Sequence, residues 1–194
     1  PALLTSAFRG ENDRVAVDTS EEGKGFSTDL PSNRAQQYHA WVPIMTGCNN
    51  FCTYCIVPYV RGRERSRTFE AVIGECERLV ADGVREITLL GQNVNSYGRD
   101  LYGKPRFAEL LRAVGQTGVE RIRFTSSNPK DLTDETIAAM KETPAVMPHL
   151  HLAVQSGSTR VLKKMNRSYT REEYLDVVSR LRAAIPGLAL STDI

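Results

Sequence analysis

The sequence lacks any run of 18 apolar residues, and its first residues do not combine a charged region, an apolar stretch and a cleavage site. A membrane-spanning helix and a secretory signal need those patterns. The sequence also lacks a large excess of charge of either sign, because its 25 Lys and Arg nearly balance its 23 Asp and Glu. A net charge of +2 permits an RNA partner but does not indicate one, since local clustering of Lys and Arg marks phosphate binding. We therefore expect a cytoplasmic, monomeric protein with no membrane contact.

Cysteine and histidine are scarce, with four Cys and three His in the chain. A structural zinc site needs four ligands, usually as two spaced pairs of Cys or His. The histidines stand at positions 39, 149 and 151, and no second cysteine pair exists. Cys76 shares one helical face with the apolar positions 69, 72, 73 and 80, which predicts a buried core thiol. The pattern is therefore not typical of zinc.

The other three cysteines, Cys48, Cys52 and Cys55, lie within eight residues in a Cys-x3-Cys-x2-Cys spacing. Three thiolates on one short loop converge on a soft ion or cluster. A ferredoxin-like carrier gives every iron a thiolate and would need a fourth nearby cysteine, which this sequence does not have. Three thiolates on a four-iron cluster leave one iron open for a substrate. We therefore predict a 4Fe-4S cluster, whose thiols fit a reducing cytoplasm.

From Trp41 onward, short apolar runs alternate with amphipathic helical patterns. Such alternation is typical of β/α units with a parallel sheet. The predicted strands lie near residues 41–46, 85–90, 121–125, 150–154 and 188–192. We expect the α/β class, as a partial (β/α) TIM-like barrel truncated after about five β/α units. Residues 41–194 would form this core domain, incomplete at its C-terminus, and residues 1–40 a linker or the tail of a missing N-terminal domain.

Capping residues mark the predicted helices. Thr68 is the expected N-cap of a helix that runs to Gly83, and Thr133 precedes two acids at the start of another. Apolar positions 107, 110, 111 and 114 share one helical face, and a short helix follows position 158. Thr170 and Glu173 form a predicted capping box. The helix that it opens has an apolar stripe at Tyr174, Leu175, Val178, Leu181 and Ile185.

Polar residues follow each predicted strand, at the end where β/α barrels gather their chemistry. The cysteine loop follows the first strand, and residues 91–95, 126–128, 155–158 and 192–193 follow the others. Such residues offer hydrogen bonds to a ribose, an amino acid head group and an adenine, and glycines let a ligand approach the backbone. The residues that we expect to bind a cofactor are Tyr54, Gln92, Asn93, Ser127, Gln155, Ser156 and Asp193.

The cysteine loop, with the aromatic Tyr54 before its last cysteine, resembles the signature of the radical S-adenosylmethionine (SAM) enzymes. The resemblance implies a barrel of the radical SAM type and an open iron that chelates the amino and carboxylate groups of SAM. It also implies that an electron from the cluster, supplied by a reductant such as flavodoxin or ferredoxin, cleaves the sulfonium to give a 5'-deoxyadenosyl radical. Cofactor chemistry of this kind leaves the protein to bind and orient, so no catalytic residue is assigned beyond the cluster ligands.

Within that group, residues 43–59, 61–62, 66–67, 89–95, 121–125 and 151–158 resemble the methylthiotransferases, especially those that modify tRNA. The likeness covers about residues 41–194, with Asn128 and Ala153 where members often have His and Pro. It implies addition of a methylthio group to C2 of N6-isopentenyladenosine beside the tRNA anticodon. Members bind a second 4Fe-4S cluster in an N-terminal domain and carry a C-terminal RNA-binding domain. Without both, this chain is expected to bind its cluster and SAM but not to complete the reaction.

Four arginines alternate just after the cysteine loop, at Arg61, Arg63, Arg65 and Arg67. A strand-like segment would point them to one side, where they could contact tRNA phosphates. The alternative is a solvated face balanced by Glu64 and Glu70. A second basic group is expected to be only a solvated face, and its members are Lys163, Lys164 and Arg167.

Two other functions stay open from the sequence. A sibling class modifies an aspartate in a ribosomal protein with the same cofactors, and its loop after the second strand differs from residues 92–95 of this chain. A non-enzymatic iron–sulfur binding or redox module is the other, and its cluster would not respond to SAM.

Overall fold

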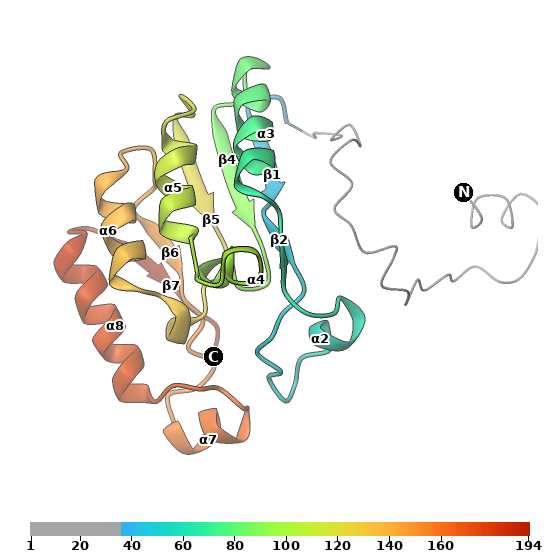
Figure 1. The fold of residues 1–194 in the computed structure, drawn as a ribbon. Coiled ribbons are helices and arrows are strands. Elements are labelled where there is room, and N and C mark those ends of the chain that lie inside the picture. Colours follow the sequence, from blue (N-terminus) through green and yellow to red (C-terminus); the bar gives the residue numbers. More distant parts are fainter. Residues whose placement is uncertain (1–35) are drawn as a thin grey trace, which may run out of the picture. The chain divides into compact units, whose positions relative to one another are not determined.

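A computed structural model describes residues 36–194 of the chain. Of the linker or tail expected for residues 1–40, residues 1–35 lie outside the described residues, and His39 and Ala40 belong to the first strand, β1. Figure 1 shows the described part as a row of strands with helices packed along it. None of the described helices is both long enough and apolar enough to cross a membrane.

The strands of the sheet are parallel and follow one another in chain order. Strands β1 (His39–Pro43), β4 (Glu86–Leu90) and β5 (Arg121–Phe124) form one parallel group, and β6 (His149–His151) pairs in parallel with β7 (Ala189–Ser191). A parallel bridge between Ser127 and Leu152 joins the two groups just past β5 and β6. Sequential parallel strands with helical crossovers are the arrangement of a β/α barrel. The predicted fold class and the five strands are confirmed, although the first begins at His39.

The five longer described helices lie where the sequence predicts them. They are α3 (Phe69–Ala81), α5 (Phe107–Gly115), α6 (Asp134–Glu142), α7 (Thr159–Lys164) and α8 (Arg171–Ala184). The sequence did not reveal several short elements, because each has too few residues for a periodic pattern. They are α2 (Val57–Val60), η1 (Val94–Ser96), α4 (Arg99–Tyr102), η2 (Pro129–Asp131) and a small antiparallel hairpin of β2 (Met45–Thr46) with β3 (Arg65–Ser66).

The predicted helix caps are present as hydrogen bonds. The hydroxyls of Thr68 and Thr133 each accept from a backbone N–H three residues later, at 3.3 and 3.2 Å. In the capping box of α8, the Glu173 N–H donates to Thr170 Oγ1 at 3.1 Å, and the Thr170 N–H donates to Glu173 Oε2 at 2.7 Å. These bonds satisfy N–H groups that the first turn of a helix leaves without partners.

One part of the predicted α8 stripe is wrong. Leu175 is 47% exposed, whereas Val177, which the prediction left out, is 6% exposed. Leu181 is fully buried, and Tyr174, Val178 and Ile185 are partly buried against the core. The helix packs through a stripe centred on positions 174, 177, 178 and 181, which is the spacing that one face of a helix has.

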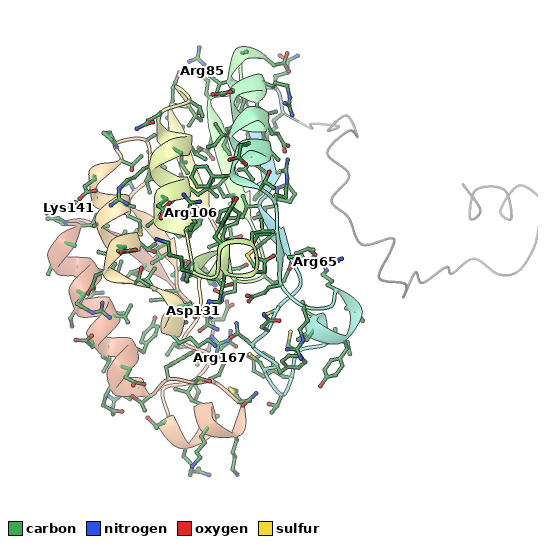
Figure 2. All side chains as sticks on the ribbon, viewed as in Figure 1. Arg65, Arg85, Arg106, Asp131, Lys141 and Arg167 are labelled. Atoms are coloured by element: carbon green, nitrogen blue, oxygen red, sulfur yellow. The ribbon has the colours of Figure 1, made fainter. Side chains whose placement is uncertain are left out.

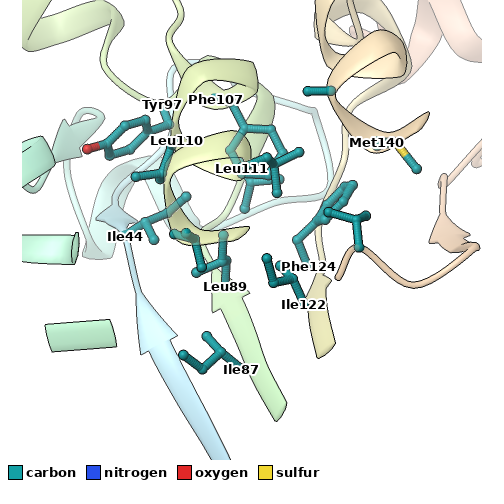
Figure 3. Packing of buried hydrophobic residues seen from close by; sticks show 14 of the residues in the cluster. Ile44, Ile87, Leu89, Tyr97, Phe107, Leu110, Leu111, Ile122, Phe124 and Met140 are labelled. Atoms are coloured by element: carbon teal, nitrogen blue, oxygen red, sulfur yellow. The ribbon is translucent and has the colours of Figure 1, made fainter. Parts of the chain in front are cut away.

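The apolar core lies on one face of the sheet. Ile87, Leu89 and Ile122 are fully buried in one cluster with Leu110 and Leu111 of α5 (Figure 3). In the same cluster, the rings of Phe107 and Phe124 meet edge to face, with centroids 5.0 Å apart. Aromatic pairs favour this geometry. Packing in this apolar cluster holds the helices against the sheet, and it thereby positions the loops that follow the strands.

Cys76 belongs to this core and not to a metal site. It is fully buried in α3, and burial raises the pKa of its thiol to about 12. A buried thiol that stays protonated behaves as a small apolar side chain. The prediction of a core thiol is confirmed.

The opposite face of the sheet is polar. Trp41, Thr88 and Arg123 stand in register across β1, β4 and β5, and Trp41 is 57% exposed. His39 Nε2 shares a hydrogen bond with Thr88 Oγ1 at 3.1 Å, and Arg123 pairs with Glu86 at 3.3 Å. This face corresponds to the interior of a β/α barrel, which the described residues surround only in part.

Truncating a core leucine tests the packing. Leu111→Ala should lower the free energy of unfolding by about 2–5 kcal/mol, because it removes buried apolar contacts and leaves a cavity. Leu101 in α4 is 45% exposed, so Leu101→Ala should change it by no more than about 0.5 kcal/mol. Urea unfolding followed by circular dichroism measures both variants. Equal losses for the two would contradict the described core.

Candidate functional site

A cavity of about 300 Å³ lies where the carboxyl ends of the strands meet. The loops after β1, β4, β5, β6 and β7 all contribute to its wall, as the sequence predicts. Its lining residues include Cys48, Cys52, Tyr54, Cys55, Gly91, Gln92, Ser127, Asn128, Gln155 and Asp193. Segments more than 140 residues apart in the chain therefore share one small chamber.

Two of the predicted cofactor-binding residues do not line the cavity. Asn93 is 1% exposed, and its amide donates to Asp131 Oδ2 at 2.7 Å. Asp131 also pairs with Arg99 at 3.2 Å, so Asn93 joins the loop after β4 to the loop after β5. Ser156 Oγ accepts from the N–H of Ser158 at 3.2 Å within its own turn. A residue's place in a loop does not reveal which way its side chain points.

The three clustered cysteines lie on one wall of the cavity as free thiols. Cys48 and Cys52 are only 8% and 9% exposed, and Cys55 is half-buried. Burial raises the pKa of the Cys48 thiol above its ordinary value. Among residues 36–194, no three His, Cys, Asp or Glu side chains converge tightly enough to hold a single metal ion. A cluster of several irons is wider than one ion, so its ligands stand farther apart around it.

The segment just before β3, residues 62–64, supports the start of the cysteine loop. Gly47 has φ +73°, and a Cβ there would lie 2.0 Å from the carbonyl oxygen of Arg63. The Cys48 N–H donates to the Gly62 carbonyl at 3.1 Å. Glu64, itself buried, accepts from the backbone and the side chain of Asn49 at 3.4 Å each. Only glycine permits this close approach of two backbones.

Backbone strain is concentrated around the cavity. In the described residues, four non-glycine residues have positive φ, namely Phe51, Ser126, Gln155 and Asn166. Ser126 and Gln155 line the cavity, Phe51 lies inside the cysteine loop, and the amide of Asn166 donates to the Phe51 carbonyl at 2.9 Å. Such conformations cost about 1–3 kcal/mol each and persist where the surrounding structure holds them.

Two buried polar atoms of the lining residues have no hydrogen-bond partner. They are Gln92 Oε1 and Ser127 Oγ, from the loops after β4 and β5. Buried polar groups are almost always hydrogen-bonded, because an unpaired one costs about 1–3 kcal/mol. These two atoms can therefore receive a polar ligand, and the thiols opposite can ligate iron.

The sequence model of the Radical SAM superfamily matches residues 42–194. The chain belongs to this superfamily. The thiols, the polar loops and the cavity all lie within the matched segment.

Sequence relatives of this radical SAM chain carry one shared name, tRNA-2-methylthio-N(6)-dimethylallyladenosine synthase. The protein from Acidothermus cellulolyticus is 57% identical over the whole chain, and that from Carboxydothermus hydrogenoformans is 53% identical. The protein from Clostridium botulinum is 54% identical over 95% of the chain. The chain spans only 39%, 44% and 41% of the length of these curated relatives, respectively.

Solved structures of other enzymes share the fold, among them a radical SAM methyltransferase. The methyltransferase TsrM from Kitasatospora setae, with tryptophan and a SAM analogue bound, has a TM-score of 0.63 at 16% identity, over 80% of this chain and 30% of that one. Methylornithine synthase has a TM-score of 0.56 at 17% identity, over 79% of this chain and 43% of that one. Likeness at such low identity shows the fold alone.

Arg167 contradicts the prediction that it belongs to a solvated face. It is half-buried, lines the cavity, and donates from Nη1 to Cys52 Sγ at 3.4 Å. Figure 2 shows it between α7 and the cysteine loop of the radical SAM domain. Lys163 and Lys164 of the same group are exposed, as predicted. No sequence pattern indicated Arg167, because its partner lies 115 residues earlier.

The four alternating arginines of this radical SAM domain do not share one face. Arg61 and Arg63 are exposed and Arg65 is half-buried, but Arg67 is 7% exposed. Arg67 donates to the backbone carbonyls of Pro43 at 2.9 Å and Ala71 at 3.3 Å, so the prediction that it contacts tRNA is wrong. The strand that would align the four, Arg65–Ser66, is only two residues long.

His151 is a cavity residue that the sequence reasoning missed. It lines the cavity beside Asp193, with Nε2 and Oδ2 3.3 Å apart. The alternation of β6 could have indicated it, since Leu150 faces the core and a neighbour in the strand must face the opposite way.

The close approach at Gly47 predicts a specific effect of one methyl group. Gly47→Ala should destabilise the chain by more than Gly62→Ala, because a Cβ at position 47 collides with backbone whereas one at position 62 meets open space. Both glycines have φ +73°, so the cost of the left-handed conformation, about 1–2 kcal/mol, is common to the two. Urea unfolding gives the difference, and equal losses would contradict the described loop.

Proposed function

We propose that this chain is the radical SAM core of a tRNA methylthiotransferase, which adds a methylthio group to C2 of N6-isopentenyladenosine beside the anticodon. The observation that carries the proposal is the set of three free thiols on one wall of a cavity that polar loops surround. The shared name of the relatives at 53–57% identity supports the choice of reaction. The core domain, expected for residues 41–194, would begin with β1 at His39, and the linker or tail of an N-terminal domain, expected for residues 1–40, would end before it.

The residues of the cavity fit a 4Fe-4S cluster and SAM. Cys48, Cys52 and Cys55 would hold the cluster, because free thiols are the ligands that iron–sulfur clusters use. The unpaired atoms of Gln92 and Ser127 are suited to accept or share hydrogen bonds with the polar groups of SAM. Tyr54, Gln155 and Asp193 complete the proposed SAM site, and Asp193 brings a carboxylate that can accept from hydroxyl or ammonium groups.

When bound, the cofactors would supply an electron and radical chemistry, which the reaction needs because an aromatic C–H is too strong and too weakly acidic for ordinary base catalysis. The side chains of this chain would hold and orient the cofactors and exclude water from them. Cys48 and Cys52 are nearly buried, so the protein limits the access of water and oxidants to the ligating sulfurs. We assign no catalytic residue beyond the three cluster ligands.

The full reaction would need more than this chain. A second 4Fe-4S cluster, which we place in an N-terminal domain, requires its own thiols, and the only other cysteine of this sequence is the buried Cys76. We therefore propose that the chain, reduced by a flavodoxin or ferredoxin and acting as a monomer, binds the cluster and cleaves SAM without forming methylthiolated tRNA. Methylthiolation by this chain alone would overturn that part of the proposal.

Cysteine variants test the cluster site. After anaerobic reconstitution, the wild type should hold about four irons and four sulfides per chain, the number in a 4Fe-4S cluster. Cys48→Ala, Cys52→Ala and Cys55→Ala should each lose most of them, and Cys76→Ala should keep them because Cys76 lies in the core. Chemical iron and sulfide analysis measures this. Retention of a full cluster by any of the first three variants would contradict its ligand role.

Addition of SAM to the reduced wild type separates an enzyme from a redox module. An iron without a protein ligand must change its electron paramagnetic resonance spectrum when SAM chelates it. An unchanged spectrum would favour a binding or redox module.

Assays of the full-length enzyme on tRNA and on the ribosomal protein distinguish the two methylthiotransferase classes.

The surface beside the cysteine loop combines aromatic and cationic side chains. Tyr59 in α2 is 74% exposed, and its ring meets that of Phe51 edge to face at 5.9 Å. The guanidinium of Arg63 lies over Phe51 at 4.6 Å, and Arg61 is exposed next to α2. Aromatic faces that can stack on bases, together with cations that pair with phosphates, are typical of single-stranded nucleic acid binding. We propose that this surface and Arg65 contact the anticodon loop.

Salt dependence tests the RNA contact. In the corresponding full-length methylthiotransferase, the combined change of Arg61, Arg63 and Arg65 to Gln should flatten the plot of log affinity for tRNA against log salt by about 0.7–0.9 per arginine that binds a phosphate. The matched control changes Arg85, Arg171 and Arg182, which carry the same charge and are all exposed, to Gln. Filter binding at several salt concentrations gives the slopes. An unchanged slope in the first variant would remove these arginines from the interface.

A further inference from the structure

Two stretches of the chain without acidic residues meet at the cysteine loop. Residues 36–63 and 143–170 contain no Asp or Glu, although the whole chain holds 23. The Thr53 N–H donates to the carbonyl of Met165, which begins the α7–α8 connection, at 3.1 Å. The Thr53 hydroxyl donates to the carbonyl of Lys164, the last residue of α7, at 3.3 Å. The segments on both sides of this contact therefore carry no negative side chain.

The helix α7 carries three cations on the face that it turns to solvent. Arg160, Lys163 and Lys164 are exposed, and their spacing of three and four residues places them on one face of the helix. Leu162 is fully buried, so the other face packs against the domain. None of the three cations forms an ion pair with another residue of the described part of the chain. We call these three residues the α7 cation face.

Exposed cations at the amino end of the sheet are paired instead. Arg85 pairs with Glu120 at 3.6 Å, and Arg121 pairs with Glu86 at 3.8 Å. An ordinary solvated surface mixes both signs of charge in this way. The α7 cation face does not, although the sequence predicts only a solvated face for its two lysines. A surface of one sign attracts a partner of the opposite sign, and phosphates are the usual partner of clustered Lys and Arg.

One acid does contact α7, but only at its first residue. Glu172 of α8 accepts from the Thr159 hydroxyl at 3.3 Å. Lys163 and Lys164 lie in the last turn, beside the cysteine loop. The positive charge of α7 is therefore least compensated at the end nearest to the cavity.

The cysteine loop lies between α2, which follows it in the chain, and α7, which bonds to it at Thr53 (Figure 1). Val57 of α2 and Gln155, in the loop that leads into α7, both line the cavity. A base reaches groups inside a cavity of about 300 Å³ only if it leaves its stack and enters through the mouth. The phosphates before and after that nucleotide then stay outside, one on each side of the mouth.

We propose that the α7 cation face binds RNA phosphates on the other side of the target nucleotide from Tyr59, Arg61 and Arg63, so that a single-stranded segment spans the mouth of the cavity. The inference rests on the proposed function in taking RNA as the substrate. It goes further by assigning a second RNA contact to a helix more than 90 residues later in the chain.

Salt dependence measures this contact in the corresponding full-length methylthiotransferase. The combined variant Arg160→Gln, Lys163→Gln and Lys164→Gln should flatten the plot of log affinity for tRNA against log salt, because each lost phosphate contact releases fewer counterions. The expected change is about 0.7 for each cation that binds a phosphate of a single strand. All three side chains are exposed, so circular dichroism should show an unchanged fold.

The control variant removes three cations from the opposite end of the sheet. Arg78, Lys141 and Arg182 are exposed in the last turns of α3, α6 and α8. Each stands shortly before a strand begins, so it lies at the amino end of the sheet, away from the cavity. Their combined change to Gln removes the same charge and should leave the slope unchanged.

Crosslinking tests where the RNA lies. A stem-loop RNA with N6-isopentenyladenosine in its loop would carry one photoreactive 4-thiouridine, either just before or just after that adenosine. On this chain, reconstituted with its cluster, one position should crosslink to residues 56–65 and the other to residues 159–165. Mass spectrometry of the crosslinked peptides identifies the segments.

Three outcomes would overturn the inference. One is an unchanged slope in the α7 variant while the variant of Arg61, Arg63 and Arg65 flattens it, which leaves the proposed function standing. Another is crosslinking of both RNA positions to residues 56–65 alone. The third is an unchanged slope together with slower reduction of the cluster by flavodoxin, which would reassign the α7 cation face to the reductant. A wild-type enzyme whose affinity for tRNA does not depend on salt would instead contradict the proposed function.

Discussion

The cysteine loop depends on hydrogen bonds that come from two distant parts of the chain. On one side the β2–β3 hairpin brings Gly62 and Arg63 against Gly47 and Cys48, and on the other side the α7–α8 connection binds Thr53. These hydrogen bonds hold the loop near both of its ends. Its shape is therefore set by elements that the core has already fixed.

The packing of the core offsets the unfavourable free energy of the residues around the cavity. Four left-handed non-glycine residues and two unpaired buried polar atoms of the described chain lie in or beside the cavity, and each is unfavourable on its own. They persist because the cluster around Ile87, Leu111 and Ile122 is closely packed and does not adjust to relieve them. A ligand that bonds to Gln92 and Ser127 would recover part of this cost, which couples binding to the stability of the domain.

The polar residues of the loops divide into two groups with different tasks. Gln92, Ser127 and Gln155 face the cavity, whereas Asn93 and Asp131 bond to each other behind its wall. The second group makes the first rigid, as residues behind a metal or ligand site commonly do. Arg167 belongs to both, because its guanidinium is tied to the loop after β6 and also reaches the sulfur of Cys52.

The amino-acid sequence by itself determined the β/α order, the helix caps at Thr68, Thr133 and Thr170, the core role of Cys76 and the superfamily. These depend on local capping bonds, short periodicities and ligand spacing, which a linear chain displays directly. Only the tertiary structure decided that Arg67 is buried, that Asn93 faces away from the cavity, that Val177 replaces Leu175 in the α8 stripe, and that Arg167 reaches Cys52. The direction of a side chain in a short loop follows from contacts with residues 38 to 115 positions away, and no local pattern records such contacts.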